Sequence, residues 1–357
     1  MQDTFKALDE IRLNFSPAAL HSLNIAIAIV MFGVALEIKL DHFKALVKNP
    51  KSPLIGVFSQ FIALPLLTFL LVIALKDFLS PTMALGMILV ASAPGGNISN
   101  FISSLSKANL ALSVSLTAFA TLSAIIFTPL NFAFWGKLAI NAYSHDATSL
   151  VRPLEINASQ MFQTVFIILG VPMLLGVFIN SKFPRLTAKI LKPIKRVSIL
   201  IFMAVIILAF KNNFDHFITA IKFVFFIVLI HNAIALSVGY GLGALFKRPK
   251  ADRRTLAIET GIQNSGLALI LIFNPKIFPP EMELGGMAIV AAWWGIWHMI
   301  SGFGLAAYWS GSLSDLWAFV SKKRLAEVKE KYMGIKHIDK KSYPYLILRW
   351  FVIFRHN

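Results

Sequence analysis

The chain has no cysteine and little charge. Its 357 residues contain no Cys, and Asp, Glu, Lys and Arg together make up only 14% of them. The absence of cysteine excludes disulfides, thiolate catalysis and thiolate metal sites, so a ligand must be bound by oxygen, nitrogen or apolar groups. In contrast, 57% of the residues are hydrophobic, more than the surface of a soluble domain of this size normally carries. The composition therefore predicts a protein of the lipid bilayer.

Nine apolar runs have about the length of a membrane span, which needs roughly 20 residues as a helix. The runs lie near residues 17–36, 53–75, 82–103, 109–135, 160–180, 197–210, 217–246, 255–273 and 285–310. We therefore expect an all-α integral membrane protein with about nine transmembrane helices.

Basic residues are twice as numerous as acidic ones, 34 against 17. An odd number of spans places the two ends of the chain on opposite sides, so the Lys and Arg distribution predicts the orientation. With the N-terminus outside, 26 of the 34 basic residues fall on inner loops and the C-terminal tail. The positive charge is thus attributed to a cytoplasmic face, and no nucleic-acid partner is expected. We expect a plasma membrane protein, located in the cell inner membrane if the source is bacterial, with a cytoplasmic C-terminus.

Two apolar segments, residues 92–100 and 259–266, contain polar and small residues at their centres. The first includes Pro94 and the Gly95-Gly96 pair, which remove a backbone donor and weaken the helix, so unwinding is expected there. Each segment precedes one long span, a pattern that predicts an inverted repeat with two broken helices crossing at the membrane midplane. The alternative is that these glycines only permit close helix packing and the proline only kinks its helix.

Glu259 is the one acidic residue expected deep inside a span, where a charge costs at least about 2.5 kcal/mol. No Lys or Arg is expected at that depth, so the partner of Glu259 is a bound cation or a proton. Neutral oxygens near it in the predicted arrangement come from Gln60, Ser99, Asn100, Ser113, Thr117 and Gln263. Carboxylate, amide and hydroxyl oxygens suit a hard alkali cation. The alternative is that these side chains only join helices by hydrogen bonds.

Six short motifs occur over residues 25–310. They are Gln60-Phe61 with Pro65, Pro94-Gly95-Gly96 with Ser99-Asn100, NLALSV at 109–114 with Thr117, His231-Asn232, ETGIQNSG at 259–266, and Trp297-His298 with Ser301-Gly302. This set resembles the sodium/bile acid symporter family. The resemblance implies a first sodium site made by residues matching Ser99, Asn100, Ser113, Thr117 and Glu259. It implies a second site made by Gln60, Glu259, Gln263 and the backbone carbonyls of Thr260 and Ile262.

The resemblance implies a secondary active transporter that couples two sodium ions to the symport of an organic anion, bile acid-like or a small carboxylate, by alternating access. Sodium is the coupling ion, and no other cofactor is expected. Glu259 and two sodium ions together leave one positive charge in a low-dielectric cavity, which favours an anion nearby. Ions and anion then increase each other's affinity.

The anion is expected beside the broken helices, because the N-termini of half-helices offer amide donors. The candidate substrate-binding residues are Gly96, Asn97, Asn264 and His298. Asn97 stands where bacterial relatives commonly have threonine, and Met299 stands where they commonly have asparagine, so the identity of the anion is open. For His298, a purely structural role is an equal alternative.

We expect a carrier domain at residues 1–310 and a basic cytoplasmic tail at 311–357. Within the carrier, a panel of roughly residues 17–45 and 158–212 is expected to rock against a core of roughly 52–136 and 214–310. Two other functions remain open on the same fold: a proton-coupled anion carrier and a non-transporting membrane receptor. An enzyme is not expected, since the sequence shows neither a membrane-depth aspartate pair nor HExxH. The expected partners are sodium, the organic anion and the bilayer, and the sequence predicts no oligomeric state.

Overall fold

Every regular element in the described part of the chain is a helix. The structure, a computed structural model, describes residues 25, 28–38, 44, 47–96, 98–143, 158–194, 196–197, 200, 214–274, 277–278, 282 and 284–311. By length and composition, five helical stretches can cross a membrane: Lys51–Ala74, Leu110–Tyr143, Val224–Leu245, Lys250–Ile272 and Gly285–Ser310. The all-α membrane class is therefore confirmed. The run near 197–210 lies almost wholly outside the described residues, so the number of nine spans stays a prediction.

The first of these stretches is a continuous helix with a π-helical segment inside it. It consists of α4 (Lys51–Phe58), η1 (Ser59–Ala63) and α5 (Leu64–Ala74). Pro65 has no N–H to donate to the carbonyl of Phe61 four residues earlier. The Asn131 side chain of α8 (Leu110–Tyr143) supplies the missing donor, with its Nδ2 3.0 Å from the Phe61 oxygen. The irregular segment therefore has a local cause and a fixed partner, and it contains Gln60.

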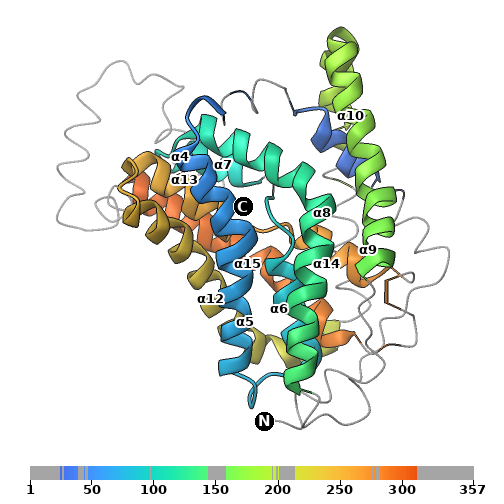
Figure 1. Ribbon diagram of the computed structural model, residues 1–357, viewed down its shortest axis with the longest axis vertical. Coiled ribbons are helices and arrows are strands. Elements are labelled where there is room, and N and C mark those ends of the chain that lie inside the picture. Colours follow the sequence, from blue (N-terminus) through green and yellow to red (C-terminus); the bar gives the residue numbers. More distant parts are fainter. Residues whose placement is uncertain are drawn as a thin grey trace, which may run out of the picture. The chain divides into compact units, whose positions relative to one another are not determined.

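Both segments that were predicted to unwind are interrupted helices. The first consists of α6 (Pro81–Ala91) and α7 (Ile98–Leu105), and it is followed by α8. The second consists of α13 (Lys250–Gly261) and α14 (Ser265–Ile272), and it is followed by α15 (Gly285–Ser310). Figure 1 shows the chain passing from α13 to α14 and from α6 to α7 through short non-helical connections.

The two breaks contact each other through their backbones. The Gly96 N–H donates to the Ile262 carbonyl at 3.3 Å, and the Asn264 N–H donates to the Ala93 carbonyl at 2.9 Å. Gly95 has a φ of 69°, a left-handed conformation that glycine adopts without steric cost. Backbone groups released by one break are thus paired with those of the other. The inverted-repeat relation and the depth of this crossing in the bilayer remain predictions.

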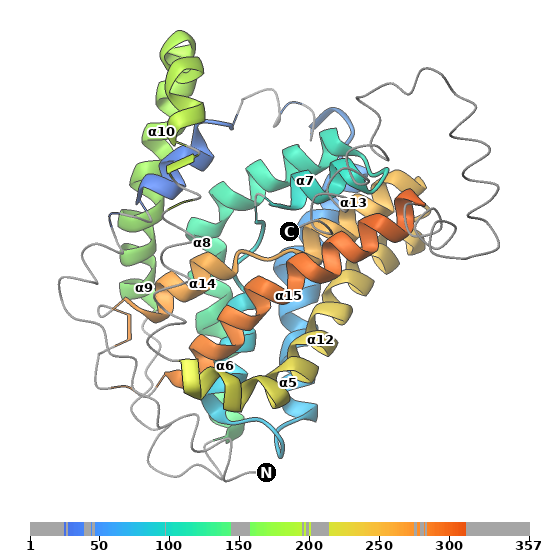
Figure 2. The ribbon, with the colours of Figure 1, turned by 180° about the vertical axis from the view of Figure 1, so that it is seen from behind.

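The helix that contains Glu259 lies closely against α12 (Phe214–Leu245). Gly239 and Gly243 occur one turn apart on α12, and a Cβ at Gly239 would lie only 2.2 Å from the Leu256 carbonyl oxygen of α13. Small residues four apart allow two membrane helices to approach at backbone distance. Figure 2 shows α12 and α13 side by side. This contact fixes the position of α13 from one side.

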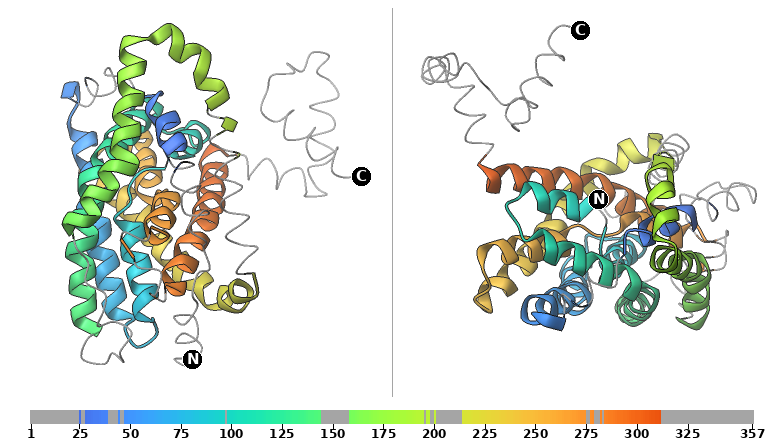
Figure 3. Two further views of the ribbon diagram at one scale, coloured as in Figure 1. Left: turned by 90° about the vertical axis from the view of Figure 1, so that its right-hand side faces the viewer. Right: turned by 90° about the horizontal axis from the view of Figure 1, so that it is seen from above.

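A second long helix with a π-helical segment consists of α9 (Ala158–Val165), η2 (Phe166–Gly170) and α10 (Val171–Lys182). After Phe183 the chain turns sharply into a further helical stretch, residues 184–194 (Figure 3). Residues 28–38 lie against α10, since the Asn180 Nδ2 donates to the Ile38 carbonyl at 2.8 Å. Two segments of the predicted panel are therefore neighbours, and their movement as one body remains a prediction.

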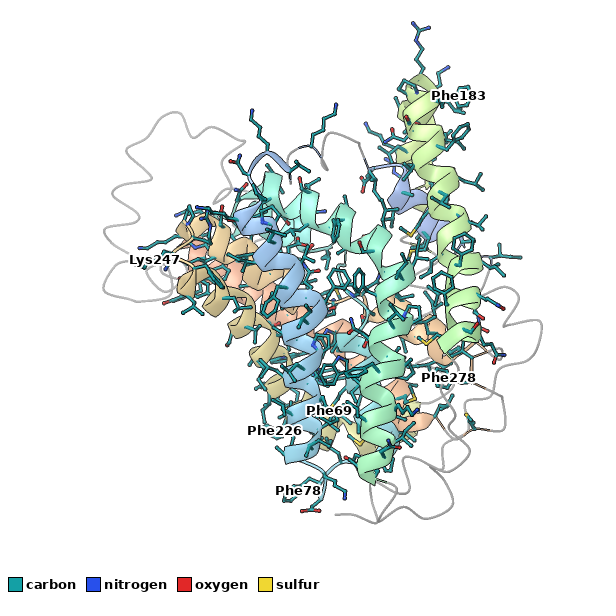
Figure 4. All side chains as sticks on the ribbon, in the orientation of Figure 1. Phe69, Phe78, Phe183, Phe226, Lys247 and Phe278 are labelled. Atoms are coloured by element: carbon teal, nitrogen blue, oxygen red, sulfur yellow. The ribbon has the colours of Figure 1, made fainter. Side chains whose placement is uncertain are left out.

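Large apolar side chains occur on the outside of the described helices as well as inside. Figure 4 shows Phe78, Phe183 and Phe226 pointing outward, and they are 58%, 53% and 64% exposed. Phe278, also labelled there, is buried and its ring lies against that of Phe132. Apolar surface of this kind suits a lipid environment. By its contacts the chain divides into two units, Met1–Ala306 and Ala307–Asn357, and only residues 307–311 of the second unit are described.

Candidate functional site

Glu259 lies at the centre of a buried cluster of oxygen atoms. Its Oε1 accepts hydrogen bonds from the Ser113 hydroxyl at 2.5 Å and the Thr117 hydroxyl at 3.1 Å, and Thr117 is 2.9 Å from Oε2. The Asn100 Oδ1 is 3.0 Å from the Ser113 hydroxyl and 3.2 Å from that of Thr117. The Ser99 hydroxyl is 3.1 Å from Thr117 Oγ1. The structure thus brings together all five side chains that were predicted for the first sodium site.

Three helices position these side chains. Ser99 and Asn100 belong to the first turn of α7, directly after the break, while Ser113 and Thr117 are one turn apart on α8. Residues four apart lie on the same face of a helix, so both hydroxyls of α8 point toward α13. Glu259 is near the end of α13, two residues before its last helical residue. Its carboxylate is therefore enclosed by the start of one half-helix and one face of a long helix.

The cluster has more hydrogen-bond acceptors than protons. The oxygens of Asn100 and ionised Glu259 only accept, and they meet the three hydroxyl oxygens, so six oxygens converge, whereas the three hydroxyls supply one proton each. The amide nitrogen of Asn100 makes none of the hydrogen bonds of the cluster. Each hydroxyl oxygen also has lone pairs of its own. Water has little access to this carboxylate, because Ser99, Ser113 and Glu259 are fully buried and Thr117 is only 4% exposed. A buried carboxylate without a positive partner is costly, and six convergent oxygens suit a hard cation.

The residues predicted for the second sodium site lie beside the break in α13. The Oε1 atoms of Gln60 and Gln263 are buried and have no hydrogen-bond partner among the described residues. Gln263 Nε2 donates to the Thr260 carbonyl at 2.7 Å, and the Thr260 hydroxyl is 2.7 Å from that of Ser59, the residue before Gln60. The Ile262 carbonyl accepts from Gly96. Each carbonyl retains a second lone pair, so these oxygens remain able to contact a cation.

The four substrate candidates have different positions. The N–H of Gly96 is already used at the crossing, and Asn264 uses its Oδ1 to accept from the Leu267 N–H at 3.0 Å at the start of α14. His298 is on the face of α15 that contacts the second break, since Gly295 and Gly302 on that face lie against Ser265 and Ile262. Its Nδ1 is buried and has no partner in the described part of the chain. Asn97 lies outside the described residues.

Two further polar residues hold the second break in place, Asn232 and Ser301, which belong to the motifs of the family resemblance but were predicted for neither ion nor anion binding. The Asn232 Nδ2 of α12 donates to the Gly261 carbonyl at 2.7 Å, which the break releases from helical pairing. The Ser301 hydroxyl of α15 donates to Asn232 Oδ1 at 2.6 Å. The signal in the sequence was an amide in the middle of an apolar run, whose partner no local pattern identifies.

Comparison with known proteins gives consistent matches. Residues 24–220 match the Sodium Bile acid symporter family. The chain is 31% identical over 291 residues to the uncharacterized sodium-dependent transporter YocS of Bacillus subtilis, covering 81% of this chain and 83% of that protein.

Mammalian relatives are also similar. The chain is 34% identical to the P3 protein of Bos taurus over 68% of its own length, and it spans about half of that relative, 48%. It is 32% identical to the sodium/bile acid cotransporter 4 of Rattus norvegicus, over 75% of this chain and 59% of the relative. More than half of the chain matches the family, and YocS is similar over most of both lengths, so the chain belongs to the Sodium Bile acid symporter family.

Proposed function

We propose that this protein is a secondary active transporter that couples the entry of two sodium ions to symport of an organic anion, bile acid-like or a small carboxylate. The observation that supports this most directly is the oxygen cluster around Glu259, in which a fully buried carboxylate faces hydroxyl and amide oxygens from α7 and α8. The sodium-dependent transporter and sodium/bile acid cotransporter among the relatives support the choice of ion. The role is transport rather than catalysis.

The two sodium sites are proposed to share Glu259. The first consists of Ser99, Asn100, Ser113, Thr117 and Glu259, and the second of Gln60, Glu259, Gln263 and the carbonyls of Thr260 and Ile262. The unpartnered Oε1 atoms of Gln60 and Gln263 support the second site, because a buried carbonyl oxygen without a donor is costly unless a cation or a donor reaches it. With both ions bound, the site has a net charge of one positive unit, which attracts the anion.

The anion is proposed to bind beside the crossing of the two broken helices, near Gly96, Asn97, Asn264 and His298. Ions and anion share the same two breaks, so each stabilises the arrangement that the other requires. We propose alternating access by movement of the panel, residues 17–45 and 158–212, against the core, residues 52–136 and 214–310. The N-terminus is proposed to be outside and the tail, 311–357, in the cytoplasm of a plasma or cell inner membrane.

The test is uptake into proteoliposomes that contain the purified full-length protein. A bile acid and a set of small carboxylates are offered under an inward sodium gradient, and again with potassium or choline in place of sodium. We expect accumulation of at least one anion above its external concentration only with the sodium gradient, and collapse of that accumulation with a sodium ionophore. Equal uptake in potassium would contradict sodium coupling, and accumulation driven by an inward proton gradient alone would favour the proton-coupled alternative.

A further inference from the structure

A second buried polar network lies at the beginning of α8 and α13, two of the three helices that form the oxygen cluster around Glu259. Asp252, in the first turn of α13, is 9% exposed. Its Oδ2 accepts from the Ser52 hydroxyl at 2.5 Å, and its Oδ1 accepts from Asn109 Nδ2 at 2.9 Å. Arg248 Nε in turn donates to the Ser52 hydroxyl at 2.9 Å. These residues belong neither to the proposed sodium sites nor to the proposed anion site.

Asn109 joins the start of α8 to the first turns of α13 through its side-chain amide nitrogen, its backbone N–H and its carbonyl, and its side-chain oxygen caps α8. Its Nδ2 donates to Asp252, and its Oδ1 accepts from the Leu112 N–H at 3.1 Å, as an N-cap residue does. Its backbone N–H donates to the Ala251 carbonyl at 3.2 Å, and its carbonyl accepts from the Thr255 hydroxyl at 3.0 Å. The register of α8 against α13 is therefore fixed at this point.

The proposed ion ligands lie one or two helical turns after Asn109 on α8 and two turns after Asp252 on α13. Ser113 and Thr117 are four and eight residues after Asn109, about 6 and 12 Å further along α8 at 1.5 Å per residue. Glu259 is seven residues after Asp252, about 10.5 Å further along α13. These separations correspond to one or two turns, so the network and the ligands occupy facing sides of the same pair of helices. A change of register at Asn109 would move both hydroxyls relative to the carboxylate.

We propose that Asn109 and Asp252 are positioning residues for sodium, which set the 2.5–3.1 Å geometry of Ser113 and Thr117 around Glu259 without contacting the ion. This inference rests on the proposed sodium coupling. The two charged partners of the network also differ in role. Asp252 accepts from both neighbouring elements, α4 and the start of α8, whereas Arg248 donates to Ser52. Loss of an orienting partner outside the ligand shell typically weakens metal binding by about 10-fold to 100-fold.

The test measures sodium affinity directly. Thermal unfolding of the purified full-length protein is followed over a sodium chloride titration, with choline chloride keeping the ionic strength constant. N109D places two carboxylates opposite each other, and D252N removes the carboxylate that accepts from Asn109. We expect each substitution to raise the sodium concentration for half-maximal stabilisation about 10-fold. The exchange variant N109D/D252N again pairs one amide donor with one carboxylate, and Asp is as good an N-cap as Asn, so its midpoint should return to within about twofold of wild type.

A matched control separates positioning from general stability. N180D removes an amide donor from a helix-to-backbone hydrogen bond on α10, which has no part in the ion sites, so it should lower the unfolding temperature in both salts without moving the sodium midpoint. If N109D does not fold, Ser52→Ala removes the Ser52 hydrogen bond to Asp252 together with the acceptor of Arg248 Nε, and a midpoint raised twofold or more supports the role. Unchanged sodium midpoints in N109D and D252N would overturn the positioning role but not the sodium sites. An exchange variant whose sodium midpoint is raised as much as in either single variant would do the same. A wild-type protein with no sodium-specific stabilisation would instead contradict the sodium sites themselves.

Discussion

Glu259→Gln should remove sodium binding while leaving the apo protein at least as stable as the wild type. The substitution keeps the shape of the side chain and one acceptor oxygen, which in the place of Oε1 can still accept from the Ser113 and Thr117 hydroxyls, 2.5 and 3.1 Å away. It replaces Oε2 by an amide group that only donates, and it removes the charge. Attraction between a carboxylate and a cation about 4 Å apart is about 4 kcal/mol at an effective dielectric constant of about 20. Losing it raises the dissociation constant about a thousandfold.

Two opposite effects on stability follow from the burial of this carboxylate. Glu259 is fully buried, and a charge in such a position costs at least about 2.5 kcal/mol when no cation is bound. In choline, E259Q should therefore unfold at the same temperature as the wild type or higher. In sodium at 100 times its dissociation constant, the wild type gains about 2.7 kcal/mol, whereas a thousandfold weaker site gains less than about 0.1 kcal/mol.

The assay is thermal unfolding of both purified proteins in sodium chloride and in choline chloride. Glu37→Gln, the same chemical change at a half-buried carboxylate just after the helical residues 28–35, is the control and should retain the sodium-dependent increase. The reasoning is refuted if E259Q is stabilised by sodium as strongly as the wild type. It is also refuted if E259Q is much less stable than the wild type in choline, because the carboxylate would then be satisfied by the protein alone.

Three further predictions concern the second ion, the crossing and the charge moved. Gln263→Ala removes the unpartnered Oε1 beside the break between α13 and α14. The Hill coefficient for sodium in anion uptake should then fall from near two toward one, and an unchanged coefficient would exclude Gln263 as a ligand. Gly95→Ala places a residue with a side chain in a left-handed backbone conformation, with its Cβ 3.0 Å from the Ala120 Cβ. The substitution should lower the unfolding temperature in sodium and in choline alike, and an unaltered temperature would show that this position tolerates a side chain without strain. Two sodium ions with a monovalent anion move one positive charge inward. An inside-negative potential of 100 mV should therefore add about 2.3 kcal/mol to the driving force for uptake of the anion. Uptake that does not depend on the potential would contradict that stoichiometry.

The breaks and the central carboxylate were predictable because their signals are local. Pro94 with Gly95 and Gly96 weakens a helix at that point, and an acidic residue such as Glu259 within an apolar run needs a polar or cationic partner. The five residues of the first site were assigned through resemblance to the family, and their convergence depends on contacts between segments far apart in the chain, such as Ser113 with Glu259. The sequence therefore indicated which oxygens were available, while the distances between them came only from the fold.

Other features depend on partners that no local pattern identifies. The π-helical segment at Gln60 follows from Pro65, but the side chain that pairs with the released Phe61 carbonyl is Asn131, 70 positions away. The register of α8 similarly depends on Asn109 meeting Asp252 across 143 positions. Polar side chains in apolar runs mark such contacts in the sequence, and only the packing of α8 and α13 determines which pairs form.

The measurement that tests the central claim most directly is coupled binding to the purified wild-type protein. Thermal unfolding is recorded with a panel of organic anions, including a bile acid and small carboxylates, in sodium and again in potassium or choline. Sodium-coupled symport predicts that at least one anion stabilises the protein in sodium and has no effect in the other two salts, and that sodium alone stabilises it to a smaller extent. Stabilisation by the same anion in all three salts, or no stabilisation by sodium under any condition, would contradict the account.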